Sequence, residues 1–206
     1  MPSSSWEPPE MLIVDETGFG LGWLEETSFA RTSHVLVHEG RLWLVDPIEP
    51  RELEERVLAL GEPAGVIQLL DRHERDSAAI AARLGVPLNV VPRELPGTPF
   101  EFRPVLRNRF WREVALWWPE RGTLVCADSL GTIPFFRAGG ERVGAHPLLR
   151  LRPPQSLLGL DPEHLLVGHG RGVHTDAAAA VDDAVRHARR RIPRWLLGVP
   201  RILRAR

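Results

Sequence analysis

The sequence lacks several residue types, and each absence narrows what the protein can be. Among its 206 residues there is one cysteine, Cys126, so neither an intrachain disulfide nor a metal site built from several cysteines can form. This composition is typical of a reducing compartment. Lysine and tyrosine are also absent, and every strongly basic side chain is arginine. We attribute that bias to a GC-rich genome and give it no mechanistic weight.

Long apolar runs are missing as well. No stretch approaches the ~18 consecutive apolar residues of a membrane-spanning helix. Residues 1–10 are rich in serine and proline and have neither a basic segment nor an apolar core, so they do not resemble a secretory signal and we expect them to be disordered. We therefore expect a cytoplasmic protein.

The composition that is present describes one globular domain. The chain has 43% hydrophobic and 26% charged residues, and its length suits a single domain with a sizeable core. The formal net charge of -1 indicates no overall preference for nucleic acid, which we do not expect as a partner.

The order of apolar patterns predicts an α/β domain over residues 11–192. Two β-rich runs around Glu39–Gly40 predict a hairpin, and a second hairpin is expected around residues 119–122. A proline-rich segment, 92–108, predicts irregular chain with an edge strand. The remaining expected elements are helices over 50–60, 77–84 and 176–191 (capped by Thr175 and ended by Pro193) and strands over 66–70, 88–91 and 165–167.

Polar clusters follow three of the apolar strands. They contain Asp71, His73 and Asp76 in the first cluster, Asp128 in the second, and His169 between two glycines in the third. Histidines and carboxylates that converge from strand ends can bind zinc, iron or manganese. An aspartate at a strand end is also a common turn or N-cap residue, and that interpretation alone would explain Asp76 and Asp128.

These features resemble the metallo-β-lactamase superfamily over roughly residues 11–190. The resemblance rests on the order of elements, on the opening hairpin that ends in Asp46–Pro47, and on the three clusters. It implies a four-layer αββα sandwich with a metal site at the sheet edge. His73 matches the second histidine of the His-x-His-x-Asp-His motif, Asp128 the metal-bridging aspartate, and His169 the final histidine.

The sequence departs from that pattern in ways that bear on the metal. Asp71 and Asp76 replace two motif histidines, Arg75 replaces the motif aspartate, and residues 107–111 contain no histidine where the family has one. We predict at most one zinc, manganese or iron ion, bound by Asp76, Asp128 and His169 with help from His73 or Asp71. The alternative is no metal, with Arg75 standing in its place and closing an ion network with Asp128 or Asp76. His174 is a candidate for a residue that contacts His169 and orients its ring without binding the metal itself.

The resemblance implies two functions of different classes. In the first, a bound metal activates water and Asp76 and Asp128 take part in hydrolysis of an ester, thioester, lactone or phosphoester. In the second, the protein is non-catalytic, and the site is a remnant or a pocket for a small ligand. Too few of the family's metal ligands are retained for a hydrolase with two metal ions, which favours the non-catalytic function over that one. A hydrolase with one metal ion remains open.

The C-terminal arm, residues 193–206, is basic and amphipathic. It interleaves arginines with Trp195, Leu196, Leu197, Ile202 and Leu203. Such a segment can lie on an anionic membrane or bind a protein partner. The alternative, which we favour from sequence, is that the apolar side chains dock on the domain while the arginines remain in water.

Overall fold

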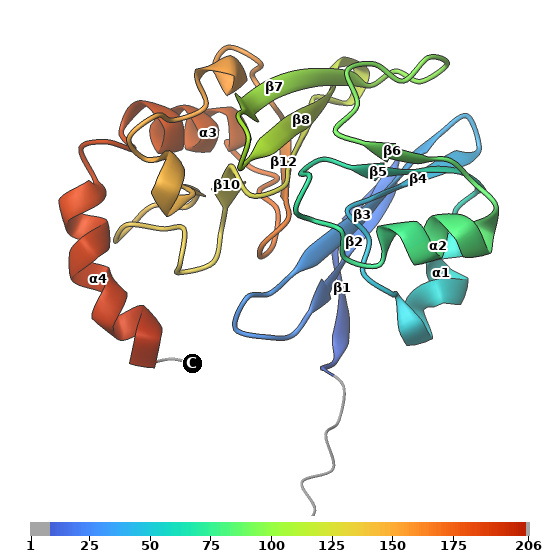
Figure 1. Ribbon diagram of the computed structural model, residues 1–206, viewed down its shortest axis with the longest axis horizontal. Coiled ribbons are helices and arrows are strands. Elements are labelled where there is room, and N and C mark those ends of the chain that lie inside the picture. The colour runs from blue at the N-terminus through green and yellow to red at the C-terminus, as the bar shows by residue number, and fades with distance from the viewer. Residues whose placement is uncertain (1–8, 205–206) are drawn as a thin grey trace, which may run out of the picture.

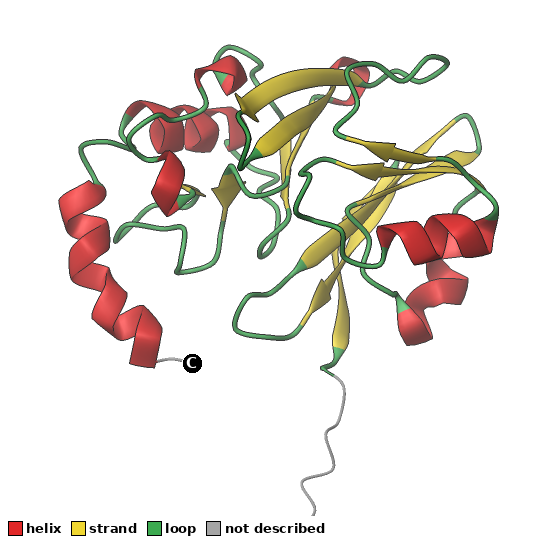
Figure 2. Ribbon diagram, viewed as in Figure 1, coloured by secondary structure: helices red, strands yellow, loops and turns green. Residues whose placement is uncertain are grey.

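The computed structural model describes residues 9–204, with side chains described up to residue 198 (Figure 1). The predicted disorder of residues 1–10 therefore falls almost wholly outside the described residues, as does the end of the C-terminal arm. Two β-sheets form the centre of the molecule, and helices lie on their outer sides (Figure 2).

The first sheet has six strands in the order β1-β2-β3-β4-β5-β6. The first four are antiparallel, and β5 and β6 run parallel to β4. Glu39 and Gly40 both have positive φ, as a two-residue hairpin turn of the primed type requires, and this confirms the first predicted hairpin. The strands are Met11–Thr17, Gly20–Glu25, Thr32–His38, Arg41–Val45, Glu62–Gln68 and Leu88–Val90.

The second sheet has four strands in the order β12-β9-β8-β7. The proline-rich segment supplies the edge strand β7, as predicted, and β8 and β9 form the second predicted hairpin. Strand β12 runs parallel to β9. The bounds are Glu101–Arg107 (β7), Arg112–Trp118 (β8), Thr123–Cys126 (β9) and His164–Val167 (β12), with a separate pair, Leu130–Gly131 (β10) and Gly144–Ala145 (β11).

Three hydrophobic clusters show how the layers pack. Val57 of α1 (Glu54–Leu58) and Ile80 of α2 (Ser77–Leu84) pack against the outer face of the first sheet. A second cluster, which includes Trp118, fills the space between the sheets. A third joins the second sheet to α3 (Ala177–Arg186), and Cys126 is buried there. The fold is thus an αββα sandwich, which confirms the predicted fold class.

Several local predictions were wrong for identifiable reasons. His34 on β3 does not face solvent as a hairpin residue could: it is buried between the sheets, where its ring Nε2 lies 3.0 Å from the carbonyl oxygen of Val167. Asp176 rather than Thr175 precedes α3, which ends at Arg186. Pro193 does not end a helix: it occupies the first turn of α4 (Ile192–Arg204), where proline is well tolerated.

The fold brings the predicted polar clusters to one edge. The loops that follow β5, β9 and β12 meet where the two sheets adjoin, and the backbone N–H of Thr32 on β3 donates to the carbonyl of Gly168 just after β12. This contact fixes the loop carrying His169 against the first sheet. No helix within residues 9–204 is long and apolar enough to cross a membrane.

Candidate metal centre

Three side chains from three loops converge at this edge. His73 Nε2 and His169 Nε2 lie 3.0 and 3.1 Å from Asp128 Oδ1. The three potential ligand atoms all lie within 4.8 Å of one another, and among the described residues they are the one group of three with metal-binding geometry. All three residues are largely buried, so they form a compact set of nitrogen and oxygen donors.

The other ring nitrogen of each histidine is already bonded. His169 Nδ1 lies 2.7 Å from the carbonyl oxygen of Phe29, and because a carbonyl only accepts, Nδ1 must carry the proton. His73 Nδ1 lies 3.3 Å from Asp46 Oδ2, a buried carboxylate that favours the same tautomer. Both Nε2 atoms therefore present lone pairs toward Asp128 when the rings are neutral, which is the arrangement of metal-ligating histidines.

The surroundings of Asp128 show that the centre suits a bound cation. Its Oδ1 is buried, and in the described part of the chain it has no hydrogen bond of acceptable geometry, although two imidazole nitrogens lie close by. A buried carboxylate oxygen without a donor is costly unless a cation or water meets it. His73, Asp128 and His169 are thus suited in kind and arrangement to hold a zinc, manganese or iron ion.

The electrostatics of the centre keep Asp128 ionised. Burial by itself would raise the pKa of Asp128, but the imidazoles of His169 and His73 outweigh it and hold that pKa far below its usual range. For His73, burial and the charge of Arg75 oppose protonation, yet Asp128 and Asp46 outweigh them and raise its pKa. In the absence of a metal, the same three residues form a carboxylate–imidazole ion network.

Another buried acid, Glu113 at the start of β8, holds the loop of Asp128. Its Oε1 accepts hydrogen bonds from the backbone N–H groups of Asp128 and Ser129, at 3.2 and 2.8 Å. Its Oε2 accepts from Trp111 Nε1 at 2.8 Å. Complete burial, together with the nearby charge of Asp128, raises the pKa of Glu113 to about 7.

Arg75 binds main-chain carbonyls. Its guanidinium donates to the carbonyl oxygens of Thr32 and Asp46, at 2.7 and 2.8 Å, and of Gly168 at 3.0 Å. No hydrogen bond in the described part of the chain joins it to Asp128 or Asp76, in contrast to the expected ion network. Arg75 thus connects the ends of β3, β4 and β12, and it supports the loop of His169 without standing between the ligands.

The two replacement carboxylates, Asp71 and Asp76, lie outside the three-residue group. Asp71 turns toward β8 and accepts from the backbone N–H and the guanidinium of Arg112; burial alone would raise the pKa of Asp71, but these hydrogen bonds outweigh it and lower that pKa. Asp76 precedes α2 and accepts from the backbone N–H of Glu49 at 2.8 Å. Both carboxylates are therefore taken up by other partners: Asp71 binds Arg112, and Asp76 binds the backbone of Glu49 without capping α2 through its side chain.

His174 also lies apart from the centre. Its Nε2 lies 3.2 Å from Asp15 Oδ1, and its Nδ1 lies 3.0 Å from His164 Nδ1. The predicted supporting contact to His169 is absent from the interactions of the described residues. The group that does support His169 is the Phe29 carbonyl, which no side-chain pattern could have indicated.

Aromatic side chains form one wall of the centre. The ring of Phe136 stacks on His169 at a centroid distance of 5.7 Å, and His146 contacts both Phe136 and Trp111. Burial lowers the pKa of His146 to about 4, so this ring is neutral at physiological pH. Arg72 lies over the ring of Trp111, 4.4 Å from its centroid, and adds positive charge beside the wall.

Sequence reasoning missed Asp46, Glu113 and His146 as parts of this site. Asp46 was noted only as the end of a strand, although it binds both His73 and the backbone N–H of Leu69, at 2.9 Å. Glu113 could have been noticed, because it stands directly before the apolar run Val114–Trp118. An acid buried there without a partner would be costly, so its position indicates that it has one. His146 lies in a segment without periodicity.

Comparisons with known proteins support the fold. No family model and no curated protein matches the sequence. Solved structures do match: the DIM-1 metallo-β-lactamase is 15% identical, with a TM-score of 0.60 over 91% of this chain and 99% of that chain. VMB-1 is 9% identical, with a TM-score of 0.58 over 91% and 98%. A metallo-β-lactamase from Pontibacter korlensis is 10% identical, with a TM-score of 0.56 over 86% and 99%.

These similarities cover most of this chain and nearly all of each matched chain. At such low identity they show the architecture, and the chain has the metallo-β-lactamase fold. The candidate centre lies at the sheet edge that the sequence resemblance predicted for this fold.

Proposed function

We propose that the protein is a metal-dependent hydrolase with one metal ion, bound by His73 Nε2, Asp128 Oδ1 and His169 Nε2. The observation that carries the proposal is the convergence of three ligand atoms within 4.8 Å, with both histidines anchored through Nδ1. Three protein ligands that leave a coordination position for water or substrate are typical of catalytic sites.

When bound, the ion would act as a Lewis acid and lower the pKa of a water molecule. The residues around it prepare the site. Asp46 and the Phe29 carbonyl hold the two imidazoles in the ligating tautomer, and Glu113 holds the backbone of Asp128. Phe136 and His146 shield one side of the centre from water, which strengthens electrostatic interactions within it.

The wall of the site bears on which substrates the protein would accept. We propose an ester, thioester, lactone or phosphoester of a small molecule. Arg72 is exposed beside Trp111, and its charge favours a substrate with a negative group near the bond that is broken.

The proposal is tested by metal retention and activity in matched variants. We expect the purified protein to retain zinc or manganese and His169→Ala to bind it at least about tenfold more weakly. His187→Ala is the control, because His187 lies on the surface after α3 and pairs with Asp183. Hydrolysis of generic esters and phosphodiesters should be lost with the metal and should return when the metal is restored.

One observation favours a second candidate, a non-catalytic role. The Nε2 to Oδ1 distances of 3.0 and 3.1 Å also suit an ion network that is complete without metal. In that case the purified protein and His169→Ala would bind metal equally weakly, and the ester and phosphodiester screen would show no turnover.

A further inference from the structure

The C-terminal end of the chain carries charge opposite to that of the rest. Residues 184–206 contain eight arginines and no acidic residue, which is a formal charge of +8, so the preceding 183 residues carry -9. The net charge of -1 conceals this asymmetry. A basic segment at one end of an acidic domain is typical of a contact with an anionic surface.

Part of this charge is neutralised within the fold. Arg191 donates to Asp183 and Glu141, at 2.6 and 3.1 Å, and Arg186 pairs with Asp182 at 3.0 Å. Arg189, Arg190 and Arg194 are exposed, as is the neighbouring Arg152, and none of the four has an ion pair within the described residues. Their charge is therefore available to an external partner.

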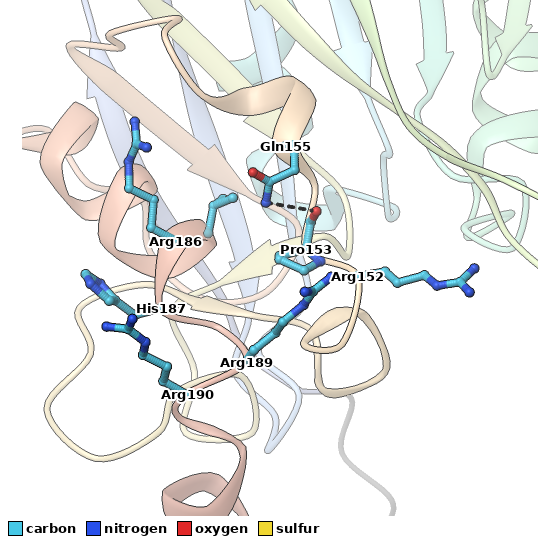
Figure 3. Close-up of a pocket in the computed structure, with 8 residues that line it drawn as sticks. Arg152, Pro153, Gln155, Arg186, His187, Arg189 and Arg190 are labelled. Atoms are coloured by element: carbon cyan, nitrogen blue, oxygen red, sulfur yellow. Dashed lines mark hydrogen bonds between the residues drawn. The ribbon is translucent and has the colours of Figure 1, made fainter.

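Arg152, Arg189 and Arg190 of these four line a shallow hollow. Its volume is about 690 Å³, and it is lined by Arg152, Pro153, Gln155, Val185, Arg186, His187, Arg189 and Arg190, without an acidic residue. The guanidinium groups of Arg152 and Arg186 point to opposite sides (Figure 3). A tight site for one phosphate requires donors that converge on it. Charges spread over a face instead suit an extended anionic surface.

Exposed leucines accompany these arginines. On α4, Leu196 and Leu197 are 56% and 82% exposed, and Leu151, next to Arg152, is 67% exposed. Trp195 anchors α4 to the domain, because its Nε1 donates to the carbonyl oxygen of Phe135 at 2.8 Å. The helix is thus held in place while two large apolar side chains beside its anchor face solvent.

We propose that α4 and residues 186–191 form a docking surface for an anionic lipid bilayer. Leucines that face solvent beside arginines on a helix too short to span a membrane are the features of an interfacial helix. The arginines match anionic headgroups, and the leucines can enter the headgroup region. A nucleic acid would use the arginines and leave the leucines in water, and a second copy would present the same positive charge.

The test uses the full-length protein and sedimentation with vesicles. The probe is a vesicle of about three parts phosphatidylcholine to one part phosphatidylglycerol, compared with phosphatidylcholine alone. We expect partitioning to be at least about tenfold stronger on the anionic vesicles and to fall about tenfold in high salt.

Two variants and one control identify the surface. Leu196→Glu/Leu197→Glu should lower partitioning at least about tenfold, and Arg189→Gln/Arg190→Gln should lower it by a similar factor. Leu60→Glu is the control, because Leu60 is 37% exposed between α1 and β5, and it should bind as the unchanged protein does. Circular dichroism confirms that each variant is folded.

Specific outcomes would overturn the proposal. They are equal binding to both kinds of vesicle, partitioning that neither double variant changes, binding of duplex DNA without vesicle binding, and a dimer in sedimentation velocity that Leu196→Glu/Leu197→Glu dissociates. The last two would assign the surface to nucleic acid or to a second copy.

Discussion

At the scale of single residues, Glu113 shows how much a buried acid can organise. Its two carboxylate oxygens accept three hydrogen bonds, from the backbone of Asp128, the backbone of Ser129 and the ring of Trp111. All three partners are donors, so the site requires an acceptor on both oxygens. Glu113 therefore helps to hold the backbone of Asp128 in the candidate centre.

Replacing Glu113 with glutamine tests that role. In Glu113→Gln, the amide NH₂ cannot accept from a donor, so at least one buried N–H loses its partner. We expect the free energy of unfolding to fall by about 1–3 kcal/mol, as measured by urea denaturation. Glu120→Gln, an exposed substitution on the turn after β8, should leave stability unchanged. Equal stability of Glu113→Gln and the unchanged protein would contradict the role.

His146 makes stability depend on pH. Burial lowers its pKa to about 4 against an ordinary value of 6.5; the charge of Asp128 opposes this shift and the charge of Arg72 supports it. The unfolded chain therefore binds the proton more readily between these values. Stability is fully present above about pH 6.5 and falls as the pH drops toward 4, by at most about 1.4 kcal/mol per pH unit.

His146→Gln should make this pH dependence shallower. Thermal melts between pH 7 and pH 4 measure it, and His187→Gln is the control, because His187 is a half-exposed histidine after α3 that pairs with Asp183. Parallel curves for His146→Gln and the unchanged protein would show that His146 does not carry the effect.

At the scale of elements, the sequence predicted the features that depend on neighbouring residues. It did not predict those that depend on partners far away in the chain. The strands that end before His73, Asp128 and His169 are apolar runs with clear bounds, so the sequence indicated both the strands and the candidate ligands that follow them. Asp71 and Asp76 carry the same local signal, but a backbone N–H of β8 and the loop before α1 take up their oxygens. Such partners are distant in sequence and could not be predicted.

The structure of the segment between β10 and β12 could not be predicted either, because its stabilising contacts are also distant in sequence. It has no periodicity, because polar contacts stabilise it in place of a regular face. Arg150 is fully buried and donates to Glu141 at 2.7 Å and to the carbonyl of Phe136 at 2.6 Å, and Arg191 at the end of the α3 region also reaches Glu141. A buried ion pair of this kind connects the segment to the helices.

Arg150→Met should destabilise the protein by about 3–5 kcal/mol, because it leaves Glu141 charged, buried and only partly paired. Arg150→Met/Glu141→Leu removes both charges and should cost less than the single substitution. Urea unfolding of the two variants gives the comparison. A double variant that is less stable than the single variant would contradict this account.

At the scale of the whole molecule, Arg75 joins the two sheets beside the candidate centre. It binds carbonyls at the end of β4 and the start of β3 in the first sheet, and after β12 in the second. Its planar fork reaches three carbonyls at once, which an ammonium group cannot do in the same geometry. The residue that replaces a motif aspartate in the resemblance therefore has a structural role in this fold.

Arg75→Lys tests how much the hydrogen bonds from the Arg75 guanidinium to both sheets contribute to stability. We expect a loss of about 1–3 kcal/mol in the free energy of unfolding, since at least one buried carbonyl loses its donor. Arg83→Lys, on the exposed side of α2, is the matched control and should have little effect. If the two substitutions change urea unfolding equally, stability does not depend on the guanidinium.

The central claim, that His73, Asp128 and His169 hold one metal ion, is tested most directly by native mass spectrometry of the full chain titrated with zinc. The account predicts one bound zinc per chain in the unchanged protein, and its loss in His73→Ala and in His169→Ala but not in His174→Ala. Two tightly bound ions per chain, none, or one ion that survives His169→Ala would contradict it.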